Sequence, residues 1–267
     1  MSQQRTETFQ VAAAVQLEIN LASGTAMVLS GEEGAVTVEV RGRDAESFRI
    51  EQSGDRIVLR PREGFGQGWR SYDVTVHVPQ GGELEVRGAS ADVNVEVALA
   101  RLRVNLASGN VRARDVATDA LVRTASGDVH LEAVGGRLDL TTASGDVEVG
   151  SVGGAASVRA ASGDLRVGTA NDDLVSNSAS GDVSVGTFGG ALLRCNTATG
   201  NVRVGLPPGR TVDIEASTLS GTFRNDFDRD TAEGSPGTPA VTQDVADNGK
   251  ARLRLRTVSG DIWLQRA

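Results

Sequence analysis

Residues 125–149, ASGDVHLEAVGGRLDLTTASGDVEV, begin and end with the same phrase, Ala-Ser-Gly-Asp-Val. The serines of the two copies lie eighteen residues apart, and further copies continue at this interval on both sides. The regular series comprises Ser108, Ser126, Ser144, Ser162 and Ser180, and Thr199 follows one residue late. A fixed period of this length indicates a repeat architecture, in which each unit stacks on its neighbours.

Apolar and polar residues alternate on both sides of the repeated phrase. After Ser144, the apolar Val147 and Val149 flank Glu148, and before it the apolar Leu138 and Leu140 flank a polar residue. The other copies follow the same pattern, and no window carries a helical period. Alternation with a period of two predicts two short strands per unit, each with one buried face. Gly and Asp in the phrase predict a tight turn between them.

Two folds have two strands per unit. We predict an all-β protein whose repeats form a β-solenoid, like a single-stranded right-handed β-helix, with about eighteen residues per coil. Equivalent residues of successive coils then lie roughly 4.8 Å apart in parallel strands. The alternative is an antiparallel meander or sandwich with Ser-Gly-Asp as a hairpin turn. We favour the solenoid because stacking places like residues together, whereas a meander does not require residue-for-residue identity between units.

The spacing of turn residues divides the chain into segments. Before residue 89 the strands are irregularly spaced, which is typical of a terminal cap. A later segment, rich in Pro, Gly, Ser and Asp, interrupts the array. We predict a flexible lead-in (1–8), irregular N-terminal β coils or cap (9–88), regular solenoid repeats (89–224), an acidic mobile loop (225–250) and a C-terminal closing coil (251–267).

Composition excludes several classes of function. The net charge of −8 argues against nucleic acid as a partner, because phosphate binding needs clustered positive charge. The single cysteine, Cys195, lies in an apolar column, which predicts a buried reduced thiol and no intrachain disulfide. No apolar run approaches the ~20 residues of a transmembrane helix. No secretory signal is visible, so we expect a cytoplasmic protein, with association with the cell envelope as the alternative.

The aspartates of the repeat form a column of their own: Asp128, Asp146, Asp164 and Asp182. In stacked coils each neighbouring pair of carboxylates would repel by roughly 1 kcal/mol in water. Such a column is tolerated if the side chains point into solvent, bond to turn amides, or hold a cation such as calcium. We favour turn-forming aspartates and expect no cofactor, because the Gly-Gly-x-Gly-x-Asp pattern of calcium-binding β-rolls is absent. The four residues remain weak candidates for a calcium site.

A glycine-rich stretch, residues 64–72, is the most unusual loop of the sequence. It carries the aromatic and basic candidates for a partner-binding loop: Phe65, Trp69, Arg70 and Tyr72. The simpler interpretation is that these aromatic side chains cover the end of the stack. Catalysis finds little support, because the two histidines, His77 and His130, show no metal-ligand spacing and no nucleophile elbow is present. We therefore expect no enzymatic activity.

The Ser-Gly-Asp-Val repeats and the opening Leu17-Glu18-Ile19-Asn20-Leu21-Ala22-Ser23-Gly24 resemble the bacterial putative-adhesin family, a domain family of unknown function. The resemblance runs from about Phe9 to Leu264. It implies a β-solenoid and an interaction role, and it brings no catalytic residues. Together these observations predict a non-enzymatic scaffold or interaction module with a protein or glycan partner. The alternative is a glycan- or ligand-binding protein or an enzyme that uses the loop 64–72.

Overall fold

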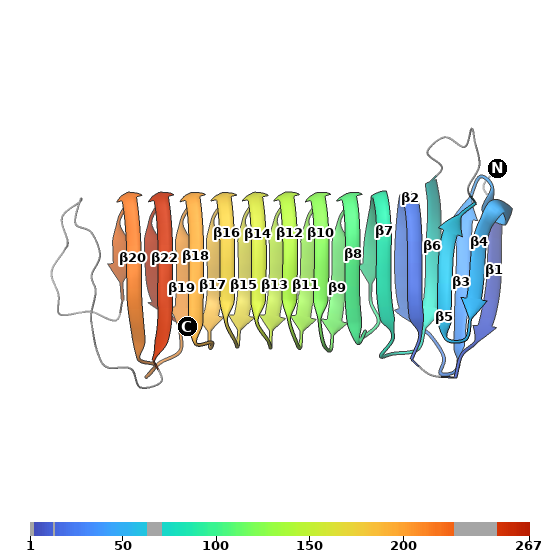
Figure 1. Cartoon of the computed structure of the whole chain (residues 1–267), viewed down its shortest axis with the longest axis horizontal. Helices are drawn as coiled ribbons and strands as arrows, with labels where there is room; N and C mark the ends of the chain where they lie inside the picture. The colour runs from blue at the N-terminus through green and yellow to red at the C-terminus, as the bar shows by residue number, and fades with distance from the viewer. Residues whose placement is uncertain (1–2, 13, 63–70, 227–249) are drawn as a thin grey trace. The chain divides into compact units, whose positions relative to one another are not determined.

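The computed structural model describes residues 3–12, 14–62, 71–226 and 250–267. It divides into two compact units, Met1–Gly136 and Arg137–Ala267, and each is considered by itself. Both units consist of β-strands (Figure 1). Among the described residues the one helical segment is the short 3-10 turn η1 (Ala45–Ser47). The predicted all-β class is confirmed.

The described residues of the first unit form eleven strands, from the irregular N-terminal segment to the first regular repeats. They are β1 (Gln3–Gln10), β2 (Gln16–Ser30), β3 (Ala35–Gly42), β4 (Phe48–Ser53), β5 (Arg56–Pro61), β6 (Ser71–Val78), β7 (Glu83–Val95), β8 (Arg101–Ser108), β9 (Val111–Val116), β10 (Ala120–Ser126) and β11 (Val129–Val134). Its coils stack in parallel, with β8 on β7 and β10 on β8, and with Ser126 in register with Ser108.

The N-terminal cap continues both faces of these coils. Strand β2 spans a whole coil; one of its edges pairs in parallel with β7, and the other pairs in parallel with β5 and then β6. Antiparallel strands follow outward, with β4 on β5, β3 on β6 and β1 on β3. The predicted lead-in over 1–8 is wrong, because Gln3–Gln10 form β1. The Arg5 side chain holds this strand by donating to the Phe48 carbonyl at 2.7 Å.

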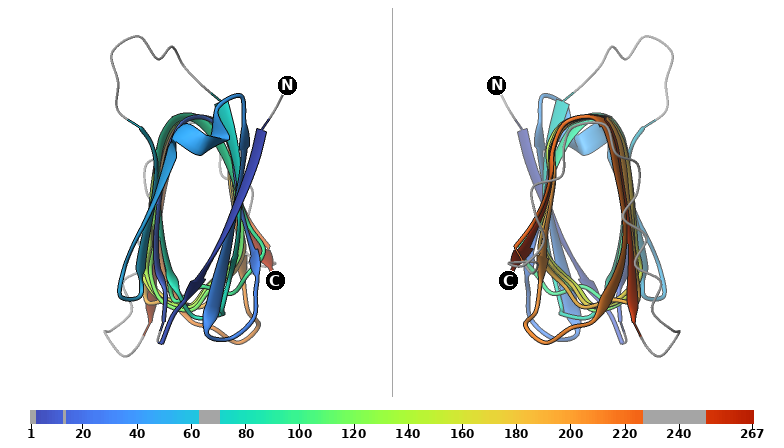
Figure 2. Two further views of the ribbon diagram at one scale, coloured as in Figure 1. Left: turned by 90° about the vertical axis from the view of Figure 1, so that its right-hand side faces the viewer. Right: turned by 90° about the vertical axis from the view of Figure 1, so that its left-hand side faces the viewer.

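Twelve strands are present in the part of the second unit that the structure describes. They are β12 (Leu138–Ser144), β13 (Val147–Val152), β14 (Ala156–Ser162), β15 (Leu165–Ala170), β16 (Leu174–Ser180), β17 (Val183–Phe188), β18 (Leu192–Thr199), β19 (Val202–Leu206), β20 (Val212–Ser220), β21 (Phe223–Asn225), β22 (Ala251–Ser259) and β23 (Ile262–Arg266). Each coil contributes one strand to each of two facing walls joined by bends (Figure 2).

Successive coils of the second unit pair in parallel and in register. Strand β14 lies between β12 and β16, and β15 lies between β13 and β17, so that Ser144, Ser162 and Ser180 stack on one another. The β-solenoid is thereby confirmed. The antiparallel alternative is wrong for the coils, because consecutive strands face each other across the core, and each pairs with a strand of the neighbouring coil.

The core consists of apolar columns that run from coil to coil. Val147 and Val149 are almost completely buried, as are Leu165 and Val167 beside them. Each buried Val or Leu contributes on the order of 1.5–3 kcal/mol. The buried Thr142 hydroxyl donates a hydrogen bond to the Ser144 carbonyl at 3.1 Å. The hydroxyl therefore keeps a hydrogen-bond partner in the core.

The coil of β22 and β23 lies between two coils that precede it in the sequence. Strand β22 pairs with β18 on one side and with β20 on the other. The prediction that residues 251–267 close the stack is therefore wrong, because β20 and β21 are the outermost strands in the described part of this unit. Leu253 and Leu255 are completely buried, whereas Ile214 stays partly exposed. The inner coil thus buries its apolar side chains more completely than the outer coil does. The predicted acidic loop lies mostly outside the described residues.

Candidate functional site

The repeat aspartates form a ladder of hydrogen bonds to the backbone of the next coil. The backbone N–H of Asp164 donates to Asp146 Oδ1 at 2.9 Å, and that of Asp182 donates to Asp164 Oδ1 at 3.0 Å. In the first unit Asn110 accepts from the Asp128 N–H at 2.9 Å in the same way. Each side chain thus satisfies an amide of the neighbouring turn, as an Asx turn would do within a single coil.

The same ladder continues across the inserted coil. Asn201 Oδ1 accepts from the N–H of Asp261 at 2.9 Å, and Asp261 Oδ1 accepts from that of Thr222 at 2.7 Å. The bond from the Thr222 backbone, assisted by the Thr222 hydroxyl, holds the pKa of Asp261 below its ordinary value. The described residues contain no group of three or more His, Cys, Asp or Glu placed to hold a metal ion. The hydrogen bonds of the ladder support the turn-forming role of these aspartates.

Only part of the predicted partner-binding loop, residues 64–72, lies within the described residues. Phe65, Trp69 and Arg70 lie outside the described residues, and Tyr72 belongs to β6. Tyr72 is 1 % exposed, its ring lies 5.0 Å from the ring of Phe48, and its hydroxyl lies 3.3 Å from Ser47 Oγ. It is a core residue of the cap and cannot contact a partner.

The candidate catalytic groups are not brought together. Cys195 is fully buried in β18, and burial raises the pKa of its thiol to about 12, which agrees with the predicted inert thiol. His77 lies in β6, with its Nδ1 3.4 Å from the Ser30 carbonyl oxygen, and His130 lies on a partly exposed position of β11.

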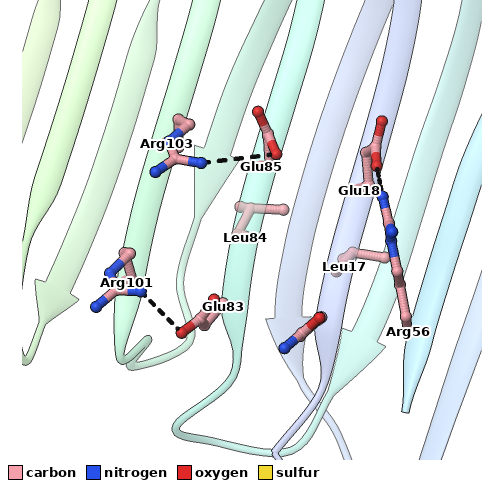
Figure 3. Close-up of a pocket in the computed structure, with 9 residues that line it drawn as sticks. Leu17, Glu18, Arg56, Glu83, Leu84, Glu85, Arg101 and Arg103 are labelled. Carbon is pink, nitrogen blue, oxygen red and sulfur yellow. Dashed lines mark hydrogen bonds and ion pairs between the residues drawn. The ribbon is translucent and has the colours of Figure 1, made fainter. Parts of the chain in front are cut away.

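Around one pocket on the outer face of the first unit, charged side chains form matched pairs. Arg56 contacts Glu18 at 2.7 Å, Arg101 contacts Glu83 at 3.2 Å, and Arg103 contacts Glu85 at 4.0 Å around a pocket of about 120 Å³ (Figure 3). The hydrogen bond from Arg56, assisted by one from Asn20, holds the pKa of Glu18 below its ordinary value. Every arginine of this pocket therefore already has a carboxylate.

The equivalent face of the second unit is not balanced in this way. Arg194 in β18 lies in register with Arg254 in β22, and Arg254 lies in register with Glu215 in β20. Arg194, Asn196, Arg254 and Arg256 line a surface pocket of about 190 Å³. We call these four residues the arginine pocket. The sequence does not reveal this pocket, because β18 and β22 become neighbours only when the coil of β22 inserts between β18 and β20.

One carboxylate contacts two of the three arginines of this pocket. Glu215 contacts Arg256 at 2.5 Å and Arg254 at 3.3 Å. The hydrogen bond from Arg256 holds the pKa of Glu215 below its ordinary value, and the charges of Arg256, Arg254 and Arg194 act in the same direction. Within the described part of the chain Arg194 has no ion pair and no side-chain hydrogen bond. The pocket can bind an anion without breaking an existing pair of Arg194.

The architecture of parallel coils capped by short sheets has a counterpart among known families. The model of the Toastrack family, DUF4097, matches residues 15–189. The chain belongs to the Toastrack family. No curated protein matches this Toastrack chain. None of its described helical segments is long and apolar enough to cross a membrane.

Solved structures are similar to this Toastrack chain, and the first of the two described here shares its fold. A crystal structure of a putative adhesin from Bacteroides fragilis NCTC 9343 aligns with a TM-score of 0.55 and 15% identity, covering 76% of this chain and 97% of that one. A putative lipid binding protein from Parabacteroides distasonis ATCC 8503 aligns with a TM-score of 0.42 and 15% identity, covering 99% of this chain and 95% of that one. At such identities the likeness concerns the fold. The predicted resemblance to an adhesin-like family of unknown function is confirmed at this level.

Proposed function

We propose that this Toastrack protein is a non-enzymatic, adhesin-like scaffold that binds a protein or glycan partner through the outer face of its coils. The observation that carries the proposal is the arginine pocket, in which Glu215 contacts two of three arginines, whereas each arginine of the pocket in the first unit contacts a carboxylate of its own. Stacked coils hold outward side chains at fixed spacings, which lowers the entropic cost of binding an extended partner. The adhesin-like relatives support an interaction role.

A direct test is the binding of the fluorescently labelled full chain to separated wall, membrane and soluble fractions of bacterial cells. We expect saturable binding to one fraction, and loss of that binding when outward arginines of β18 and β22 are replaced. If the chain binds none of the fractions saturably, the proposed scaffold function is wrong. If Trp69→Ala abolishes binding while the arginine variants retain it, the alternative site in the loop 64–72 is favoured.

The absence of enzymatic activity also needs a measurement. A panel of glycoside, ester and peptide substrates should show no turnover above the rate of a heat-denatured sample. The cytoplasmic location stays a prediction, and fractionation of cells that express the chain would decide between it and the envelope. Turnover that disappears in a single-residue variant would overturn the non-enzymatic assignment.

A further inference from the structure

We propose that the arginine pocket binds the anionic group of an acidic glycan, a carboxylate or a sulfate carried on a sugar. The inference rests on the proposed function and specifies the chemistry of its partner. Its basis is the combination of an arginine without an ion pair, a small open pocket and neighbouring side-chain amides on β16 and β18.

The charge arrangement is unfavourable in the absence of a ligand. Arg194 and Arg254 are directly opposite each other on adjacent parallel strands, and like charges in such cross-strand pairs are destabilising. Glu215 reaches Arg254 and Arg256 from the far side, leaving Arg194 without a partner among the described residues. In the first unit the corresponding arginine, Arg103, has Glu85 beside it. An unfavourable pair of like charges that other residues do not fully neutralise is expected at functional sites.

The size of the pocket limits what it can hold. Its volume of about 190 Å³ is smaller than the roughly 300–1,000 Å³ of a typical enclosed ligand site. It is open to solvent on the flat outer face of the sheet, and its side chains are partly to fully exposed. A single charged group of an extended ligand fits these dimensions better than a whole cofactor does.

The residues around the pocket favour a sugar as the carrier of that group. Guanidinium groups match carboxylate and sulfate oxygens with two parallel hydrogen bonds. Asn196 Nδ2 donates to Asn177 Oδ1 at 2.9 Å. Asn196 Oδ1 and Asn177 Nδ2 make no side-chain hydrogen bond to a described residue. This pair therefore offers one donor and one acceptor to hydroxyl groups. An acidic sugar carries both hydroxyls and an anion, whereas an acidic peptide side chain carries only the anion.

Calorimetric titration of the full chain tests the proposal with defined probes. The probes are a sulfated tetrasaccharide, a tetragalacturonate, an uncharged tetrasaccharide and a tetraglutamate peptide. We expect one or both acidic sugars to bind, more weakly as salt rises, and the uncharged sugar and the peptide to bind at least about tenfold more weakly. The comparison of the two acidic sugars distinguishes sulfate from carboxylate recognition.

Matched variants localise the binding. Arg194→Gln and Arg254→Gln should each weaken it about tenfold, while Arg103→Gln, at the same position relative to its turn in β8, should leave it within about twofold. Thermal melting confirms that each variant is folded. Equal losses in all three variants, tighter binding of the peptide, or no binding of either acidic sugar would overturn the inference. If the wild type still binds a cell fraction saturably in that last case, the scaffold function stands and only its glycan chemistry fails.

Discussion

The carboxylate of Asp164 accepts a hydrogen bond from the backbone N–H of Asp182, its counterpart one coil further along, at 3.0 Å. We expect Asp164→Ala to lower the free energy of unfolding by about 1 kcal/mol, because the turn amide loses its acceptor. Asp164→Asn should be nearly neutral, since Asn201 performs the same role for Asp261. Urea denaturation of both variants measures the difference. Equal destabilisation by Ala and Asn would show that charge, and not the acceptor, is what matters.

Calcium should have no effect on stability. The oxygens of Asp146 and Asp164 that face the next coil are already occupied by backbone amides. We expect the melting temperature in millimolar calcium and in excess chelator to agree within about 1 °C. A rise of several degrees with calcium, reversed by the chelator, would restore the cation interpretation of the aspartate column.

Buried and exposed neighbours of one strand should respond very differently to substitution. Val147 is 1% exposed, whereas Glu148 points outward. Val147→Asp should destabilise the protein by at least about 3 kcal/mol, because it buries a carboxylate among apolar columns. Glu148→Ala should change stability by less than about 0.5 kcal/mol. If Val147→Asp does not fold, Val147→Ala gives the smaller measurable loss. Equal melting temperatures for the Val147 and Glu148 variants would refute the assignment of faces.

The turn glycine of each coil faces a strict steric limit. Gly181 has a φ of 130°, and a Cβ there would lie 2.0 Å from the carbonyl oxygen of Gly163. Gly181→Ala should cost about 3 kcal/mol or more, since both the backbone and its neighbour must move. Gly209 also has a positive φ, 78°, but a Cβ there meets nothing within 4 Å. Gly209→Ala should therefore cost only about 1 kcal/mol, measured by chemical denaturation.

The ion pair of Glu18 and Arg56 predicts a pH dependence of stability. Because the folded pKa of Glu18 lies below its ordinary value of 4.5, its contribution is complete above that value. The contribution is lost as the pH falls through the lower folded pKa. The difference in melting temperature between wild type and Glu18→Gln should therefore be largest near neutral pH and shrink in acid. In an Arg56→Gln background, Glu18→Gln should change the melting temperature much less. A difference between wild type and Glu18→Gln that grows in acid would contradict the stabilising ion pair.

The sequence predicts the periodic parts of the molecule well. The period of the serines and the alternation around Val147 determine strand, turn and register, because stacked coils place equivalent residues together. Tyr72 was misjudged, since its glycine-rich surroundings hide that it begins a buried strand. The position of the last coil could not be predicted. The phrases Thr218-Leu219-Ser220-Gly221 and Thr257-Val258-Ser259-Gly260 fit equally well beside β18. The arginine pocket depends on that choice and was missed with it.

The insertion of β22 between β18 and β20 has a consequence for synthesis of the chain. β20 leaves the ribosome well before β22, yet its hydrogen-bonding neighbour in the described structure is β22. Until β22 has emerged, the nascent β20 lacks its partner strand in the described structure, although its turn phrase matches that of β22. The coil of β22 and β23 must therefore insert between β18 and β20 after both of those strands have been synthesised.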